Sequence, residues 1–234
     1  MTPIKTIALK EFRDYFVSPI AYIVIALFLI VSGWFFFSTF FIFGRADLRD
    51  FFSLLPMTFS FFIPAITMRL FAEEKNVGSY ETLLTMPVSF THIALGKFLA
   101  ATAFAGAMLL PTLSYPLFIA NIGTVDPGPV IGGYLGAMLL AMTYCSMGLF
   151  ASSLTRNQIV AFIIGCSLCF TLTILDRMLF FIPEALVSVV EYLGANAHFM
   201  NVSKGIIDSR DILYFASVSF IFIFSTYIAM KEKN

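Results

Sequence analysis

Long apolar runs separated by short polar segments make up most of this chain of 234 residues. Six of these runs are long enough to cross a bilayer, because a membrane-spanning helix needs roughly 20 apolar residues. Each run is continuous rather than alternating residue by residue, which favours a helical bundle over a β-barrel. We therefore predict an all-α membrane protein, a six-transmembrane-helix bundle in a single domain over residues 1–234. The predicted spans cover about 20–43, 51–71, 93–121, 130–151, 159–175 and 212–230.

The N-terminal segment, residues 3–18, has a different pattern. Its apolar residues recur at helical spacing and its charged residues cluster largely elsewhere, which predicts an amphipathic interfacial helix at the membrane surface. Its charges are spread along the segment, with no short apolar core and cleavage site, so it does not resemble a signal peptide. Ser18 and Pro19 then break the chain before the first span. The charged residues are Lys5, Lys10, Glu11, Arg13 and Asp14.

The fourth predicted span is rich in glycine. Small residues three or four positions apart let helices approach closely in a membrane. We therefore expect this span to lie buried between the others. The glycines are Gly132, Gly133, Gly136 and Gly148.

An insertion at 176–211 mixes polar residues with apolar pieces that are too short to cross a membrane. We predict short outer helices here, before the last span. Two interpretations remain open, because the helices could gate the outer end of a pathway or could only pack against the bundle. The residues that would shape such a gate are Pro183, Glu184, Glu191 and Gly194.

Basic residues indicate which way the bundle faces, because short cytoplasmic loops tend to carry more Lys and Arg than outer loops. With both termini in the cytoplasm, nine basic residues face inside and five face outside. We therefore predict cytoplasmic termini, which agrees with an even number of spans. The inside set is Lys5, Lys10, Arg13, Arg69, Lys75, Lys97, Arg156, Lys231 and Lys233. The outside set is Arg45, Arg49, Arg177, Lys204 and Arg210.

Composition supports the membrane assignment and narrows the function. Hydrophobic residues make up 59% of the chain and charged residues 12%, whereas soluble domains carry about 25% charged residues. The net charge is zero, so no attraction to nucleic acid is implied. The span interiors hold almost no charge, which argues against a proton- or ion-coupled carrier. A transporter powered from outside the bilayer, with large apolar or amphipathic cargo, fits this pattern better.

No pattern typical of a catalytic or metal centre occurs in the sequence. The cysteines lie inside apolar runs, and their single CxxC has no second cysteine pair to complete a metal site. The histidines are isolated, so we interpret them as structural or interfacial. GxxxxGK[ST] is absent, since Gly96 and Lys97 lack the preceding glycine loop. We therefore predict that the chain is not an enzyme and holds no cofactor or metal. These cysteines and histidines are Cys145, Cys166, Cys169, His92 and His198.

The loop at 72–92 is the longest predicted cytoplasmic connection between adjacent spans. Charged residues begin it, and Gly78-Ser79 allows a turn and a helix start, with Ser79 as the N-cap. Residues 81–86 then make about two helical turns, which Pro87 ends. A short helix of this kind could dock in a groove on a partner. It could also rest on lipid headgroups as a surface helix, and both interpretations remain open.

The same segment resembles a known family. Its Glu73-Glu74-Lys75, followed by Gly-Ser, Glu-Thr-Leu-Leu, Pro and a later Gly-Lys, closely resembles the first cytoplasmic loop of ABC-2 type (type-2 exporter) permeases. The likeness extends over nearly the whole chain and looks nearest to the gliding-motility-associated branch. It implies that residues 78–86 are a coupling helix that fits into an ATPase subunit. The implied coupling residues are Glu73, Glu74, Gly78, Ser79, Glu81, Thr82, Leu83, Leu84, Met86 and Pro87.

The resemblance also implies partners and a location. The chain would be one half of a homo- or heterodimer, working with ABC ATPase subunits that bind the ATP and Mg, among membrane lipids in the bacterial inner membrane. An extracytoplasmic auxiliary protein is a further candidate partner. Two alternatives from other classes stay open, a non-transporting anchor or regulatory module of an envelope complex and a secondary carrier. The substrate-binding residues are not identified by the resemblance.

Overall fold

The computed structural model describes residues 3–43, 47–80, 88–121, 123, 126–181, 190, 192–206 and 208–232. These residues form helices and turns without any strand, and six of the helices are long and apolar enough to cross a membrane. The predicted all-α, six-helix class is confirmed. The helices are α1 (Pro3–Val17), α2 (Pro19–Phe43), α3 (Arg49–Thr67), α4 (Arg69–Val77), α6 (Phe90–Leu109), η1 (Leu110–Leu113), α7 (Ser114–Ala120), α8 (Pro127–Leu154), α9 (Gln158–Ile174), η2 (Leu175–Phe181), α11 (Ala195–Ser203) and α12 (Ser209–Glu232).

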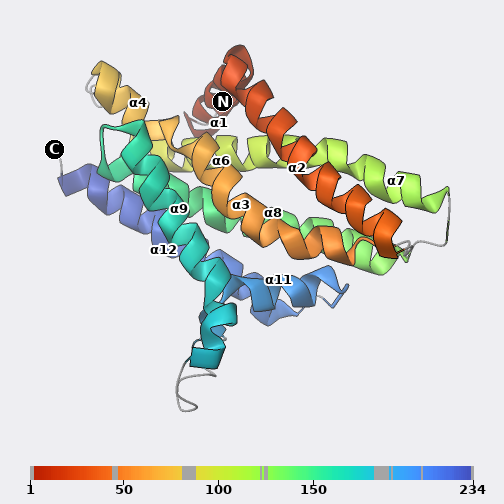
Figure 1. Ribbon diagram of the computed structural model, residues 1–234. Helices are drawn as coiled ribbons and strands as arrows, with labels where there is room; N and C mark the ends of the chain where they lie inside the picture. The colour runs from red at the N-terminus through yellow and green to blue at the C-terminus, as the bar shows by residue number, and fades with distance from the viewer. Residues whose placement is uncertain are drawn as a thin grey trace.

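Helix α8 is the centre of the bundle, in contact with α3, α6, α9, α11 and α12 (Figure 1). Its most apolar stretch is 72% buried. A Cβ at Gly133 would lie 2.3 Å from the ring of Phe52, and one at Gly148 would lie 1.9 Å from the hydroxyl oxygen of Thr67. No real Cβ could fit there, so these glycines let α3 contact the backbone of α8. The burial expected for the fourth span is confirmed.

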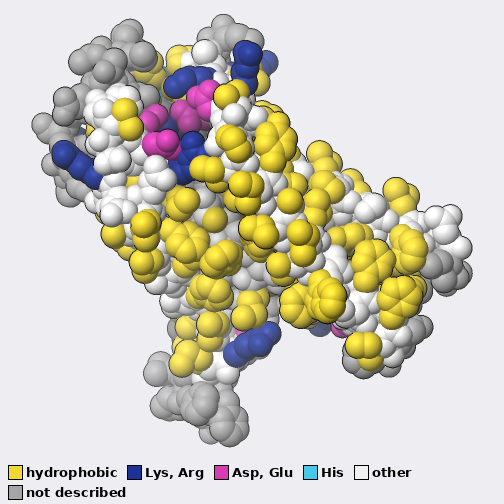
Figure 2. All heavy atoms as spheres, turned by 45° about the horizontal axis from the view of Figure 1, so that its top comes forward, with side chains coloured by type: hydrophobic (Ala, Val, Ile, Leu, Met, Phe, Trp, Pro, Cys, Tyr) yellow, Lys and Arg dark blue, Asp and Glu magenta, His cyan; other side chains and the backbone are white. Residues whose placement is uncertain are grey.

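Helices α2, α9 and α12 form the periphery, where the corresponding stretches are only 28%, 22% and 22% buried. Their outward side chains include the exposed Trp34, Phe41 and Phe220. Apolar side chains cover much of the flank of the molecule in Figure 2. Exposure of this apolar surface to water would cost free energy, so the surface is suited to contact with lipid tails.

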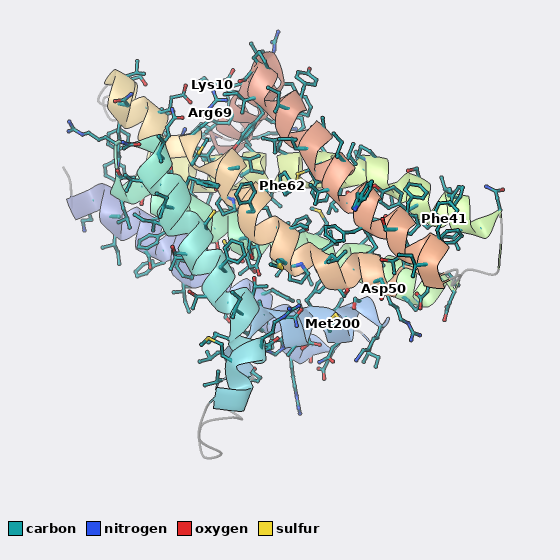
Figure 3. The ribbon with its side chains drawn as sticks, viewed as in Figure 1. Lys10, Phe41, Asp50, Phe62, Arg69 and Met200 are labelled. Carbon is teal, nitrogen blue, oxygen red and sulfur yellow. The ribbon has the colours of Figure 1, made fainter. Side chains whose placement is uncertain are left out.

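The bundle has two distinct ends. Lys10 and Arg69 lie at one end, with α4, whereas Phe41, Asp50 and Met200 lie at the opposite end, with α11 (Figure 3). We refer to these as the α4 end and the α11 end. Both chain termini lie toward the α4 end (Figure 1).

Helix α1 is the amphipathic helix predicted for residues 3–18, and its apolar side packs along α6. The ring of Tyr15 stacks on that of Phe104 with centroids 4.7 Å apart. A Cβ at Gly96 would lie 2.7 Å from the side chain of Ile7, so this glycine allows α1 to approach α6 closely. Lys5 stays exposed on the opposite side of α1. The position of α1 at a membrane surface stays a prediction.

Three predicted boundaries differ from the structure. The second helix continues past Thr67 as α4, so Ala72 to Val77, which polarity placed in the loop, are helical. The third span is helical from Phe90 to Ala120, three residues earlier than the predicted start at 93, and it tightens at Leu110–Leu113, where Pro111 lies, between α6 and α7. The fifth helix continues as η2 through Phe181, beyond the predicted end at 175.

The outer insertion is partly described. Within it, α11 packs against α8, α12 and α3, and its Phe199 and Val202 are fully buried. This half of the insertion is therefore part of the bundle rather than a loose surface helix. Pro183, Glu184 and Glu191 lie outside the described residues, so the gate interpretation stays a prediction.

Candidate functional site

The predicted coupling segment begins at the tip of α4. Glu73 and Glu74 lie on α4, and Gly78 ends this helix in the left-handed conformation with φ of 82°. Ser79 and Tyr80 return to helical conformation directly afterwards. The remaining coupling residues lie outside the described residues, so their role stays a prediction. They are Glu81, Thr82, Leu83, Leu84, Met86 and Pro87.

Gly78 is required for its backbone conformation rather than for space. A Cβ built at this position would meet no atom within 4 Å, whereas the positive φ disfavours residues that carry a Cβ. A left-handed residue after the last helical turn is a common way to end a helix. Gly78 therefore sets the direction in which the chain leaves α4.

A fully buried lysine lies at the base of α4. The ammonium group of Lys97, on α6, donates hydrogen bonds to Glu11 Oε1 at 3.0 Å, to Glu74 Oε1 at 2.7 Å and to the carbonyl oxygen of Leu70 at 2.8 Å. Its side chain has no exposed surface. The same nitrogen lies 5.2 Å from the centre of the Phe71 ring, which adds a cation–π contact. One cation thus joins α1, α4 and α6.

Sequence reasoning missed this cluster. It counted Lys97 among the cytoplasmic cations, and it considered Gly96-Lys97 as part of the family-like loop and as an incomplete phosphate-binding motif. The available signal was the position of Lys97 within an otherwise apolar helix, where an ionisable residue usually has a dedicated partner. The identity of the partners, Glu11 and Glu74, could not be read from spacing, because they come from separate helices.

The junction between α3 and α4 is braced by α8. The hydroxyl of Ser152 accepts hydrogen bonds from the backbone N–H groups of Phe71 and Ala72, each at 3.0 Å, and donates to the carbonyl oxygen of Met68 at 2.8 Å. It satisfies amide groups at the start of α4 that would otherwise lack a helical partner. About one turn further along α4, Lys75 donates a hydrogen bond to the backbone carbonyl oxygen of Ser153. Helix α4 is therefore fixed to α8 along one side.

A second set of contacts joins α3 and α4 to the end of α1 and to the turn that follows it. Arg69 forms an ion pair with Glu73 at 2.7 Å and donates a hydrogen bond to the hydroxyl of Ser18 at 3.0 Å. Tyr15 donates to the carbonyl oxygen of Ile66 at 3.0 Å. Burial raises the pKa of Tyr15 well above its ordinary value, so this phenol remains a donor at neutral pH.

A polar pocket of about 270 Å³ opens between α1 and α4. We call it the α1–α4 pocket. Figure 2 shows acidic side chains gathered between basic ones at this end of the molecule. The second carboxylate oxygen of Glu74 is buried and has no hydrogen-bond partner among the described residues. The pocket is lined by Lys10, Glu11, Asp14, Tyr15, Arg69, Leu70, Glu73, Glu74 and Ser79.

Tyr80 holds the first residues after Gly78 against α4. Its side chain is buried, and its ring lies 5.0 Å from the ammonium group of Lys75. Burial raises the pKa of Tyr80, and the nearby charge of Glu74 adds to this effect. The phenol is therefore neutral at physiological pH and contributes mainly packing.

The histidines occupy separate structural positions. At the start of α6, His92 Nδ1 lies 2.8 Å from the hydroxyl of the N-cap residue Ser89. At the α11 end, His198 Nδ1 lies 2.6 Å from Asp211 Oδ1, and the His198 ring stacks on Tyr214 with centroids 4.1 Å apart. No group of three or more metal-ligating side chains occurs within the part of the chain that the structure describes.

The fold and these contacts define a polytopic helical membrane protein with a braced helical extension at one end. The chain matches the family described as ABC-2 family transporter protein over residues 5–230, and so it belongs to the ABC-2 transporter family. Comparison with curated proteins gives no match. Family membership supports a membrane permease of an ABC transporter, and permeases of this family are normally non-catalytic subunits. It also implies association with an ABC ATPase and dimerisation.

Proposed function

We propose that this chain is a permease half that moves its substrate across the bacterial inner membrane with energy from a separate ATPase subunit. The ATPase docks at the α4 end, on the segment from Gly78 to Pro87. The observation that carries the proposal is the bracing of α4 by buried polar contacts to α1, α6 and α8. A force applied at Gly78 would reach these three helices together, because the contacts tie them to α4.

The proposed topology places the α4 end in the cytoplasm, with both termini. The excess of Lys and Arg in the segments predicted to face the cytoplasm supports this orientation. The ATPase binds the ATP and Mg, and no cofactor is proposed for this chain. The α11 end would then face outward, where an auxiliary protein could bind.

The proposed complex contains two permease halves, identical or different. Helix α9 supports a second half, because its weakly buried surface carries the exposed hydroxyls of Ser167 and Thr171 in the middle of a span. Both hydroxyls donate to carbonyl oxygens of their own helix, and small residues of this kind are enriched where membrane helices pack closely. We propose export, as the resemblance to type-2 exporter permeases implies, and a large apolar or amphipathic substrate, because the spans offer few polar groups to bind it.

The proposal is tested by substituting the coupling segment. In lipid nanodiscs, Leu83→Ala with Leu84→Ala should abolish binding of the co-purifying ATPase and the stimulation of ATP hydrolysis. Leu117→Ala, an exposed apolar position on α7, is the matched control and should leave both unchanged. Unaltered ATPase binding in the double variant would contradict the coupling assignment.

The same reconstitution separates the alternatives. A permease should show ATP-dependent movement of cargo and ATP hydrolysis that responds to substrate. An anchor or regulatory module should bind its complex without any substrate-stimulated hydrolysis. A secondary carrier should work in vesicles that contain only this chain and an ion gradient.

A further inference from the structure

The α1–α4 pocket carries one negative charge more than its cations balance. Its four carboxylates share three cations, including the buried ammonium group that contacts two of them. Two outer pairs are balanced, because each has one acid and one base. The excess therefore belongs to the inner group around Lys97. The carboxylates are Glu11, Asp14, Glu73 and Glu74, and the cations are Lys10, Arg69 and Lys97.

Within this inner group, the oxygen that lacks a partner belongs to Glu74. One of its carboxylate oxygens accepts from Lys97, whereas the other is buried without a hydrogen-bond partner among the described residues. A buried charged oxygen that lacks a partner costs free energy, because it has lost water and gained nothing in return. A cation that entered the pocket could supply the missing interaction.

The neighbouring segment of this chain does not supply that cation. Residues 81–87 contain Glu81 and neither Lys nor Arg. Among the described residues, Lys97 is the only cation within 4.0 Å of Glu74. The pocket includes Ser79 and therefore lies beside the start of the coupling segment. A protein docked on this segment would be positioned to place a side chain in the pocket.

We propose that the α1–α4 pocket receives an arginine side chain of the ATPase subunit, which pairs with Glu74. The inference rests on the proposed function, since it requires an ATPase at the α4 end. A guanidinium fits the site because its planar fork of donors can bind more than one carboxylate oxygen, and it is more weakly hydrated than an ammonium group. The pocket volume of about 270 Å³ is smaller than the roughly 300–1,000 Å³ typical of small-molecule sites. It is therefore better suited to a single side chain. The ATPase would then contact α1 as well as the coupling segment.

The test uses two substitutions with opposite expected effects. Binding of the purified ATPase to the full chain in nanodiscs is measured at several salt concentrations. Glu74→Gln removes the excess charge, so the Kd should rise about tenfold and its salt dependence should become weaker. Lys10→Gln removes an exposed cation at the rim, so the Kd should fall and its salt dependence should become steeper. Asp208→Asn, at an exposed position near the α11 end, is the control and should change neither quantity.

The outcomes separate this inference from the proposed function. Failure of the unaltered chain to bind an ATPase would contradict the proposed function itself. Binding by the unaltered chain, without opposite shifts in the two variants, would overturn the arginine site alone. If Glu74→Gln does not fold, as judged by its thermal midpoint, Lys10→Gln decides the matter, and equal or weaker ATPase binding in that variant overturns the site.

Discussion

A single lysine links three helices at the α4 end. Lys97 donates to Glu11 and Glu74 and also to a backbone carbonyl, with no exposed surface of its own. Burial of an ammonium ion costs several kcal/mol unless such partners compensate for the lost water. Loss of either carboxylate contact would therefore leave a charged group without its partner.

Substitution of this lysine should destabilise the whole protein. Lys97→Met leaves Glu11 and Glu74 without their cation, and breaking a buried pair in this way costs about 3–5 kcal/mol. The thermal midpoint in detergent should fall clearly. Lys10→Met is the matched control, because Lys10 forms only an exposed pair and should contribute within about 1 kcal/mol. Equal midpoints for the two variants would show that the buried cluster is not stabilising.

The cluster also marks the limit of sequence reasoning at this scale. The charges of Glu73 and Glu74 could be recognised as part of a family-like loop, because they are consecutive in the sequence. The pairing of Glu74 with Lys97 could not, since it depends on how α4 and α6 pack. A turn at this point was easier to predict, because Gly78 followed by Ser79 is typical of a turn before a helix start. That Gly78 ends a helix was not predicted, since residues 72–77 were placed in the loop.

At the scale of elements, α4 is an extension of a membrane helix rather than a loop. The hydroxyl of Ser152 binds the amides of Phe71 and Ala72, and Gly78 ends the helix. Polarity placed these residues outside the bundle, but polar residues are helical here because α1, α6 and α8 supply their partners. Hydropathy found the six apolar helices because lipid requires them. It could not place the tighter turn at Leu110–Leu113, where Pro111 has no N–H to donate.

Removal of the Ser152 hydroxyl should loosen the start of α4. Ser152→Ala leaves two buried amides without their acceptor, at a cost of about 1–3 kcal/mol for an unsatisfied group. Hydrogen exchange at residues 70–75 should become faster than in the unaltered protein. Ser217→Ala removes an exposed hydroxyl that bonds only within its own helix, and it should leave this exchange unchanged. Equal protection in both variants would contradict the bracing role.

Substitution of Gly78 should affect coupling more than folding. Gly78→Ala meets no steric clash, but the left-handed conformation costs about 1–2 kcal/mol for a residue with a Cβ. If the turn relaxes, the coupling segment leaves α4 in another direction, and ATPase affinity should fall by up to about tenfold, the equivalent of 1.4 kcal/mol. Gly78→Asn should be tolerated better, because asparagine adopts this conformation more readily. Identical affinities for the alanine variant and the unaltered chain would show that the turn direction is unimportant.

At the scale of the whole molecule, a buried core of α3, α6 and α8 is surrounded by the lipid-exposed α2, α9 and α12. At the α4 end the buried Lys97 joins three helices, whereas the buried pair of His198 and Asp211 at the α11 end joins only α11 to α12. This asymmetry agrees with the proposal that energy arrives from one side of the membrane. The family match covers residues 5–230, which is nearly the whole chain.

The proposed second half should be close to the exposed hydroxyls of α9. A cysteine introduced by Ser167→Cys should form cross-links between two copies in native membranes, if the complex is a homodimer with this interface. Ile221→Cys, at an exposed position on α12, is the matched control and should not form cross-links. Cross-linking of the control with no reaction at α9 would place the contact between copies on another face.

The side of the membrane that α4 faces, and its contact with an ATPase, can be measured together. Val77→Cys introduces a thiol at an exposed position on the tip of α4, whereas Asn201→Cys introduces one on α11. With a membrane-impermeant maleimide, Val77→Cys should react only from the cytoplasmic side, and bound ATPase should protect it, while Asn201→Cys should react only from outside. Reaction of Val77→Cys from the outer side, or its full reactivity in the ATPase complex, would contradict the proposal that this chain is driven through α4.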